Sequence, residues 1–207
     1  YQEKKLMIKK KLIKNAYKVD KFLIKYLKKQ KNSLLIKPMK YGVITGGKKI
    51  RSTIIFDFGK IFNLSEKKLI NICAAVECIH SYSLIHDDLP CMDNDIMRRG
   101  KPSTHIKFGE ASAVLAGSSL LTLAFEIIVE KKYLLNFKMK NEIIKSLASC
   151  SGHTGIAGGQ ELDLSSGDLT IDVAGDIILD ADGADVLLKD AGTTYGTLTN
   201  GSGNLII

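Results

Sequence analysis

The stretch AAVECIHSYSLIHDDLPCMD, residues 74–93, decides the fold of this 207-residue chain. With residues 65–73 before it, this stretch predicts a buried, apolar helix of at least about five turns that ends near His86. Three aspartates, Asp87, Asp88 and Asp93, follow at the end of this helix. Because the helix macrodipole and the unpaired carbonyls disfavour negative charge there, we expect a bound cation.

The carboxylates and the arginines that follow them predict a magnesium and phosphate site. Clustered oxygen ligands without a His or Cys pattern suit Mg²⁺, which often shares its ligand shell with substrate phosphates. Arg98 and Arg99 come next, and arginine pairs with phosphate through two parallel hydrogen bonds. A solvated acidic loop is the alternative interpretation, and the adjacent arginines disfavour it.

A second cationic segment is GGKKIR, residues 46–51, a glycine turn that opens a predicted helix. Such a turn lets backbone N–H groups approach an anion, with Lys48 and Arg51 one turn apart on the same face. The segment does not match a P-loop. Two cationic sites beside a metal cluster, within an apolar helical interior, indicate two phosphorylated, lipid-like substrates, or two ends of one, with tails that enter the bundle.

The remaining helical pattern predicts an antiparallel bundle over the first 164 residues. The segment punctuated by Pro38, Gly42, Gly46 and Gly47 is expected to form a loop. In the first helix, the apolar stripe is expected to consist of Leu6, Ile13, Tyr17, Ile24 and Leu27. Besides the helix that ends near His86, we expect helices at residues 3–31, 49–62, 110–132 and 140–164.

The chain changes character after Leu164. Residues 1–163 carry 29 basic and 15 acidic residues, a balance of +14, whereas residues 164–207 carry one lysine and seven aspartates, a balance of −6. Short alternating strands follow Gly167, Gly175 and Gly183 at a spacing of eight residues. We therefore expect a helical domain at 1–164 and a β-repeat tail at 165–207 that resembles phage tail-fibre repeats and has a foreign, chimeric origin.

Composition excludes several classes of protein. The 45% hydrophobic content and near-zero mean hydropathy are those of a core-forming protein, and no uncharged apolar run reaches the roughly eighteen residues of a membrane span. Tyr1 and the lysines after it predict neither a signal peptide nor a native start, so we expect a fragment. Of the 30 basic residues 27 are lysine, which argues against a nucleic-acid surface. Four cysteines without C-x-x-C spacing suit a reducing cytoplasm.

Five motifs together carry a family resemblance. They are GGKKIR at 46–51, the stretch 74–93, RRGKP at 98–102, KFGEA at 107–111 and GGQELDL at 158–164. In this order they resemble the N-terminal half of the trans-isoprenyl diphosphate synthase (polyprenyl synthetase) family, of the bacterial farnesyl diphosphate synthase type. The resemblance implies a mainly α, isoprenoid-synthase-type helical bundle and a cytoplasmic homodimer formed through the helical domain. It also implies Mg²⁺-dependent, head-to-tail condensation of an allylic diphosphate with isopentenyl diphosphate to give farnesyl diphosphate.

The resemblance also implies the roles of individual residues. Asp87 and Asp93 would coordinate Mg²⁺, with Asp88 as a ligand or just outside the ligand shell. Arg98 and Gln160 would bind the allylic diphosphate, and Gln160 and Asp163 match a helix that faces the catalytic cavity. Tyr82, five positions before Asp87, would close the tail pocket roughly 7–8 Å from the metal and so select a C15 product. Isopentenyl diphosphate would be held by the Gly47 backbone, Lys48, Arg51, His80 and Arg99.

The sequence departs from the family pattern in its last quarter. The second aspartate-rich motif and a lysine that contacts the leaving group are not found, and Asp176–Asp180 resembles that motif only superficially. We therefore expect weak or no turnover by this chain alone. The alternative hypotheses are a structural or attachment protein with a non-catalytic helical domain, and a nucleic-acid binder, which the placement of the arginines disfavours.

Overall fold

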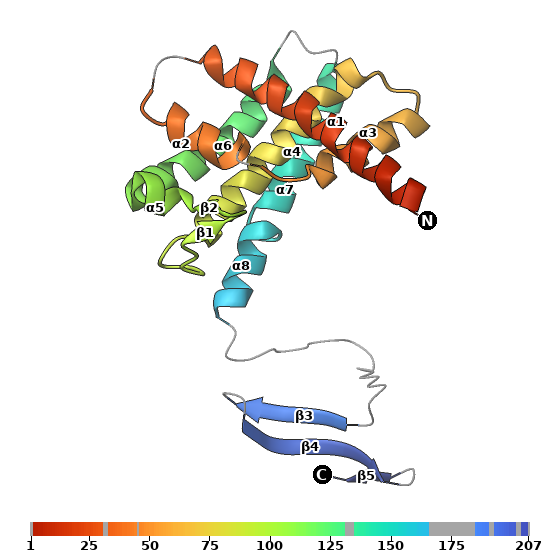
Figure 1. Ribbon diagram of the computed structural model, residues 1–207, viewed down its shortest axis with the longest axis vertical. Helices are drawn as coiled ribbons and strands as arrows, with labels where there is room; N and C mark the ends of the chain where they lie inside the picture. The colour runs from red at the N-terminus through yellow and green to blue at the C-terminus, as the bar shows by residue number, and fades with distance from the viewer. Residues whose placement is uncertain are drawn as a thin grey trace. The chain divides into compact units, whose positions relative to one another are not determined.

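A computed structural model describes residues 2–30, 33–44, 46–130 and 135–165, and three strands within 185–206 (Figure 1). The chain divides into two compact units, Tyr1–Ser166 and Gly167–Ile207. The first unit contains eight described helices and a small hairpin, which confirms the mainly α fold class. Its elements are α1 (Gln2–Lys28), α2 (Ile36–Ile44), α3 (Ile50–Ile61), α4 (Glu66–Asp87), β1 (Met97–Arg98), β2 (Lys101–Pro102), α5 (Thr104–Phe108), α6 (Glu110–Val129), α7 (Phe137–Ser151) and α8 (Ile156–Leu164).

Helix α4 is the centre of the bundle and packs against α6, α3 and α1 (Figure 1). Small residues allow this close packing: a Cβ at Gly59 would lie 2.2 Å from the Leu69 side chain, and one at Gly117 would lie 2.4 Å from His86. Phe56 is among the largest fully buried side chains, and burying such a side chain contributes roughly 1.5–3 kcal/mol. The predicted helix that ends near His86 is confirmed and ends one residue later, at Asp87.

The expected loop around Pro38 is wrong, because residues 36–44 form α2. Pro38 lies in the first turn, where its missing N–H costs no helical hydrogen bond. Gly42 lies where α2 meets α4, and a Cβ there would be 2.4 Å from Ile85 Cδ1. Both residues that favour a loop in the sequence therefore have a place inside a packed helix.

The predicted stripe of α1 is also wrong. Leu6, Ile13, Tyr17 and Ile24 are exposed, and only Leu27 of that set is buried. The buried face lies on the second half of the helix and consists of Asn15, Val19, Leu23, Tyr26 and Leu27. A lysine-rich helix with apolar residues on more than one face leaves the choice of buried face to its neighbours, which here are α2, α3 and α4.

The single helix expected at 140–164 is two helices, α7 and α8, separated by Gly152–Gly155. A Cβ at Gly155 would lie 2.0 Å from the Cys150 carbonyl oxygen, so the chain can turn this tightly only at glycine. The other expected helices, at 3–31, 49–62 and 110–132, match α1, α3 and α6 to within a few residues.

Two helices, α4 and α6, are long and apolar enough to span a membrane by length and composition. In the most apolar window of each, 56% of α4 and 44% of α6 are buried within the protein, and the two helices pack against each other. Their apolar character is therefore used in the bundle core.

The second unit contains a three-stranded antiparallel sheet in the order β3–β4–β5. The strands are β3 (Asp185–Asp190), β4 (Thr193–Gly201) and β5 (Asn204–Ile206), and a register shift lies at Leu188/Lys189. Strand β3 coincides with the predicted repeat that follows Gly183. The repeats predicted after Gly167 and Gly175, and the segment Asp176–Asp180, lie outside the described residues.

Candidate active site

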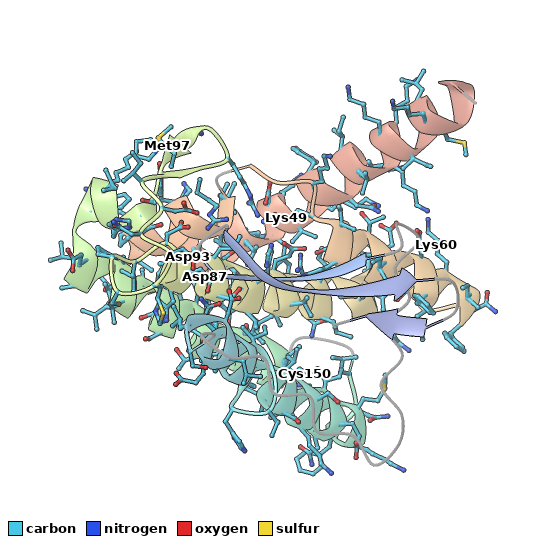
Figure 2. The ribbon with its side chains drawn as sticks, turned by 90° about the horizontal axis from the view of Figure 1, so that it is seen from below. Lys49, Lys60, Asp87, Asp93, Met97 and Cys150 are labelled. Atoms are coloured by element: carbon cyan, nitrogen blue, oxygen red, sulfur yellow. The ribbon has the colours of Figure 1, made fainter. Side chains whose placement is uncertain are left out.

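The carboxylates lie at the C-terminal end of α4, as predicted. Asp87 is the last residue of the helix, and the loop after it turns back so that the Asp93 N–H donates to the Asp87 carbonyl oxygen at 2.9 Å. Figure 2 shows both aspartates at this end of the helix. Burial, and next the charge of Asp93, raise the pKa of the Asp87 carboxyl. Two carboxylates held in this way favour a bound cation.

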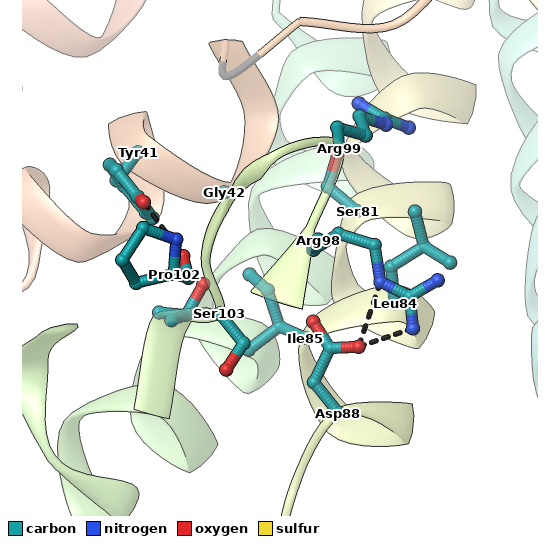
Figure 3. Close-up of a pocket in the computed structure, with 11 residues that line it drawn as sticks. Tyr41, Gly42, Ser81, Leu84, Ile85, Asp88, Arg98, Arg99, Pro102 and Ser103 are labelled. Carbon is teal, nitrogen blue, oxygen red and sulfur yellow. Dashed lines mark hydrogen bonds and ion pairs between the residues drawn. The ribbon is translucent and has the colours of Figure 1, made fainter. Parts of the chain in front are cut away.

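Asp88 has a different environment from its neighbour. Its side chain is 3% exposed, and its carboxylate accepts hydrogen bonds from Arg98 Nε, at 2.8 Å, and from Arg98 Nη2 (Figure 3). Burial raises the pKa of Asp88, and the Arg98 guanidinium opposes that rise. Among the residues that the structure describes, no three His, Cys, Asp or Glu side chains gather closely enough to hold one metal ion. The three predicted aspartates thus have two environments: Asp87 and Asp93 form a pair of carboxylates, and Asp88 holds the Arg98 side chain.

A tight hairpin directs the two arginines to different places. Strands β1 and β2 pair Arg98 with Lys101, which leaves Arg99 and Gly100 as a two-residue turn. Their φ angles of 54° and 73° are the left-handed values that a type I′ turn requires. Arg98 extends to Asp88, whereas Arg99 Nη1 donates to the Gly46 carbonyl oxygen at 2.8 Å. Tyr41 Oη donates to Pro102 O at 2.7 Å and holds the hairpin to α2 (Figure 3).

The glycine loop before α3 fits closely around Arg99. Gly47 has a φ of +102°, and a Cβ there would lie 2.6 Å from Arg99 Nη1. Only glycine therefore satisfies both the backbone conformation and the contact. The sequence predicted that Lys48 and Arg51 share a helix face, and this prediction is wrong. The helix begins at Ile50, so Lys48 lies in the loop before it.

A cavity of about 610 Å³ opens between this loop, α4 and the hairpin. Every residue that the resemblance assigns to isopentenyl diphosphate lines it, although these residues come from three separate segments of the chain. The complete lining is Gly46, Gly47, Lys48, Lys49, Ile50, Arg51, Glu77, His80 and Arg99. The excess of cationic groups makes this cavity suited to an anion.

His80 is a neutral member of that lining. Arg51 Nη1 lies 3.3 Å from His80 Nε2, and because arginine only donates, Nε2 accepts and the ring proton belongs on Nδ1. Burial, and next the charge of Arg51, lower the pKa of His80 to about 4. At neutral pH, His80 thus supports Arg51 without adding positive charge.

A second cavity, of about 110 Å³, lies between α4 and α8. Asp87, Tyr82 and Gln160 all line it, with Tyr82 five residues before Asp87 on α4. The Tyr82 ring packs edge-on against His86 at a centroid distance of 4.9 Å. Gln160 Nε2 is buried, and no described group accepts a hydrogen bond from it. Asp163 is exposed and does not line this cavity.

Comparison with known proteins identifies the family. The model of the Polyprenyl synthetase family matches residues 32–176, which is more than half of the chain. The chain belongs to the polyprenyl synthetase family. The match includes both cavities and the hairpin, and extends past the predicted boundary at 164.

Its similar proteins include farnesyl diphosphate synthases. That of Escherichia coli K12 is 47% identical over 136 residues, which cover 65% of this chain and 46% of the relative. That of Buchnera aphidicola from Acyrthosiphon pisum is 48% identical over 139 residues, covering 66% and 49%. The chain therefore spans about half the length of these curated relatives.

Solved structures agree with the bundle. The apo crystal structure of an FPP/GFPP synthase from Zymomonas mobilis has a TM-score of 0.75 and 39% identity, covering 81% of this chain and 61% of that one. A geranyltransferase from Legionella pneumophila has a TM-score of 0.75 and 36% identity, covering 80% and 60%. The isoprenoid-synthase-type fold that the resemblance implied is confirmed.

Membership of the polyprenyl synthetase family implies a divalent metal, and the observed donor set fits one. Asp87 and Asp93 supply hard oxygen ligands, and the raised pKa of Asp87 reflects in part the charge of Asp93, which a cation would offset.

Sequence reasoning missed two charged residues of this polyprenyl synthetase site, Lys49 and Glu77. Both are buried and both line the larger cavity. The available signal was a glutamate within the apolar run of α4, because a charged residue is almost never buried without a partner.

Proposed function

We propose that this chain carries the substrate-binding half of a prenyltransferase that joins an allylic diphosphate, dimethylallyl or geranyl, to isopentenyl diphosphate. The observation that carries the proposal is the cationic cavity of about 610 Å³, which the Arg98–Arg99 hairpin links to the Asp87 and Asp93 carboxylates. The names of the relatives, farnesyl diphosphate synthase and geranyltransferase, support the same reaction class.

In this proposal the larger cavity holds isopentenyl diphosphate. Lys48, Arg51 and Arg99 neutralise its diphosphate, and the Gly47 backbone N–H donates to it. His80 accepts from Arg51 and so holds that guanidinium toward the cavity. Because the arginine and the histidine are already paired before substrate arrives, little side-chain entropy is lost on binding.

The allylic diphosphate would bind on the opposite side of the hairpin. Asp87 and Asp93 would hold Mg²⁺, which supplies charge neutralisation to the leaving diphosphate when bound. Arg98 donates to the same diphosphate, and Asp88 orients Arg98 through its hydrogen bonds to Nε and Nη2. Gln160 Nε2, which lacks a described acceptor, is placed to donate as well.

The reaction then follows from these positions. The allylic C–O bond breaks, the double bond of isopentenyl diphosphate supplies the electron pair of the new C–C bond, and a proton leaves to the released diphosphate. Positive groups that are already in place stabilise the charge that develops on the leaving group. The lining near Tyr82 includes the apolar side chains of Met92, Ile156 and Leu164, which would help to keep water from the allylic cation once substrate covers them.

We further propose a C15 product, because the Tyr82 ring lies in the smaller cavity with Asp87 and would close its tail pocket. A homodimer formed through the helical domain and a cytoplasmic location complete the proposal; the four free cysteines suit a reducing compartment. Residues 165–207 would be a β-repeat segment of separate origin. Amplifying and sequencing source DNA across Leu162–Gly167 tests that origin, and an uninterrupted reading frame would contradict it.

Calorimetric titration of the 207-residue chain tests the function. We expect isopentenyl diphosphate to bind without added metal and geranyl diphosphate to bind at least tenfold more tightly with Mg²⁺ than with EDTA. Arg51→Met should weaken the binding of isopentenyl diphosphate. Lys60 is an exposed lysine at the other end of α3, and Lys60→Met should leave that binding unchanged. Failure of the unaltered chain to bind either diphosphate would overturn the proposal.

A second arm tests turnover by incubating the chain with Mg²⁺ and both five-carbon diphosphates. Because the sequence lacks the second aspartate-rich motif, we expect weak or no product from this chain alone. Abundant farnesyl diphosphate would contradict that expectation and would support the proposed reaction directly.

A further inference from the structure

A buried ion cluster, which we call the Lys49 cluster, lies beneath the larger cavity and consists of Lys49, Glu77, Asp20 and Ser52. The side chains of Lys49 and Glu77 are 2% and 3% exposed, and that of Asp20 is 27% exposed. The members come from α1, the loop before α3, α3 itself and α4. Charges buried this deeply are kept only when they are paired.

Lys49 turns away from solvent because of its backbone. Its φ of 45° is left-handed, which ends the glycine loop and starts α3. The Lys49 Nζ donates to Val43 O at 2.6 Å and lies 3.6 Å from Glu77 Oε2 and 3.7 Å from Asp20 Oδ1. The ammonium group thus makes one hydrogen bond and two ion-pair contacts within the protein, so its charge is directed to these groups rather than to a molecule in the cavity.

Glu77 organises the start of α3 from the neighbouring helix. Its Oε1 accepts from Ser52 Oγ at 2.8 Å and from the Ser52 backbone N–H at 3.3 Å. These contacts fix the first turn of α3, which carries Arg51 next to Ser52. Glu77 also lines the cavity beside Arg51 and His80. A carboxylate in this position would repel any anion that the cavity receives.

We propose that Lys49 is the charge-compensating residue of this anion site. It compensates the charge of Glu77, the carboxylate of the cluster that lines the cavity, so that Glu77 can hold the α3 N-terminus beside Arg51 without repelling a diphosphate. Lys48 and Arg51 then act as ligands, while Lys49 acts only through Glu77. This inference rests on the proposed function of the cavity as a diphosphate site.

Titration of the full 207-residue chain with inorganic diphosphate and with isopentenyl diphosphate tests the inference. Lys49→Met should weaken both ligands at least tenfold, because Glu77 is left uncompensated. Glu77→Gln should bind at least as tightly as the unaltered chain, because Gln still accepts from Ser52 and the repulsion is gone. The double variant Lys49→Met/Glu77→Gln should return to within threefold of the unaltered chain.

Lys60→Met is the matched control, since Lys60 is an exposed lysine at the C-terminal end of α3, away from the cavity lining, and its substitution should leave both affinities unchanged (Figure 2). Thermal unfolding of each variant separates loss of binding from loss of fold. If Lys49→Met does not fold, Glu77→Gln decides: binding more than threefold weaker than that of the unaltered chain overturns the inference.

The double variant also separates the inference from the proposed function. If the unaltered chain binds diphosphate but Lys49→Met binds equally well, or the double variant stays as weak as Lys49→Met, charge compensation is wrong and the diphosphate site stands. If the unaltered chain binds neither ligand, both proposals are overturned.

Discussion

Substituting Gly47 by alanine should lower both the stability of the chain and its affinity for isopentenyl diphosphate. Its φ of +102° is one that alanine rarely adopts, and its new Cβ would lie 2.6 Å from Arg99 Nη1 and 2.9 Å from Cζ. The backbone strain costs about 1–3 kcal/mol of stability. The clash is relieved by moving the Arg99 guanidinium, which breaks its hydrogen bond to Gly46 O.

The magnitude of the binding effect follows from that displaced group. The displaced Arg99 guanidinium would lose its hydrogen bond to the diphosphate of the ligand. A hydrogen bond to a charged group contributes about 1.5–3 kcal/mol, and Arg99 is exposed, so the lower value applies. Because about 1.4 kcal/mol corresponds to a factor of ten, we expect the affinity for isopentenyl diphosphate to fall roughly tenfold. Calorimetric titration measures this change, and urea unfolding measures the stability.

Gly109→Ala is the matched control for this experiment. Gly109 has a φ of +88°, and a Cβ there would meet no atom within 4 Å, so the variant carries strain without a clash. It should lose about 1–3 kcal/mol of stability and no affinity. If Gly47→Ala binds isopentenyl diphosphate as tightly as Gly109→Ala, the assignment of Arg99 to that ligand is wrong.

Three further predictions concern single side chains. Asp87→Asn should weaken Mg²⁺-dependent binding of geranyl diphosphate at least tenfold while raising metal-free stability at pH 7, because burial and Asp93 both disfavour the Asp87 charge; titration and urea unfolding would contradict this if both values stay unchanged. Since the pKa of His80 is lowered to about 4, the folded chain excludes a proton that the unfolded chain binds below a pH of about 6.5, and the free energy of unfolding should decrease as the pH falls from about 6.5 to about 4. His80→Gln should reduce that loss by on the order of 1–2 kcal/mol in urea unfolding, and an equal loss in both proteins would contradict the reasoning. Tyr82→Ala should deepen the tail pocket, so that any product is longer and a C20 diphosphate gains affinity relative to a C15 one; an unchanged ratio in competition titration would contradict the proposed role of the ring.

Local signals in the sequence predicted most of the helices correctly, for identifiable reasons. The apolar run of α4 has no glycine or proline between Glu66 and Asp87, and the carboxylates at its end oppose the helix dipole. The predicted loop was wrong because proline and glycine were taken as helix breakers without regard to their position in the helix or their packing contacts. Pro38 fits the first turn of a helix, and the close contact of Gly42 with Ile85 exists only once α2 packs on α4.

By itself, the sequence determined which chemical groups this protein brings to its site. The order of its motifs predicted two anion sites beside a carboxylate cluster, and the resemblance assigned Arg98 to one and Arg99 to the other. The inference of the two anion sites needs only residue type and spacing, because hard oxygen ligands and guanidinium groups have the same preferences in any fold, whereas the assignment of each arginine rests on the resemblance.

The tertiary structure alone decided which partner each of those groups has and which of them face a cavity. Adjacent aspartates look equivalent in sequence, yet Asp87 lies in the cavity with Tyr82 while Asp88 is buried against Arg98. Likewise, Lys48 and Lys49 differ only in that the left-handed backbone of Lys49 turns it toward Glu77. The charged partners of Asp88 and Lys49, which are Arg98 for the first and Glu77 and Asp20 for the second, lie ten or more residues away in the chain, so burial and pairing fix their roles only after the helices have packed.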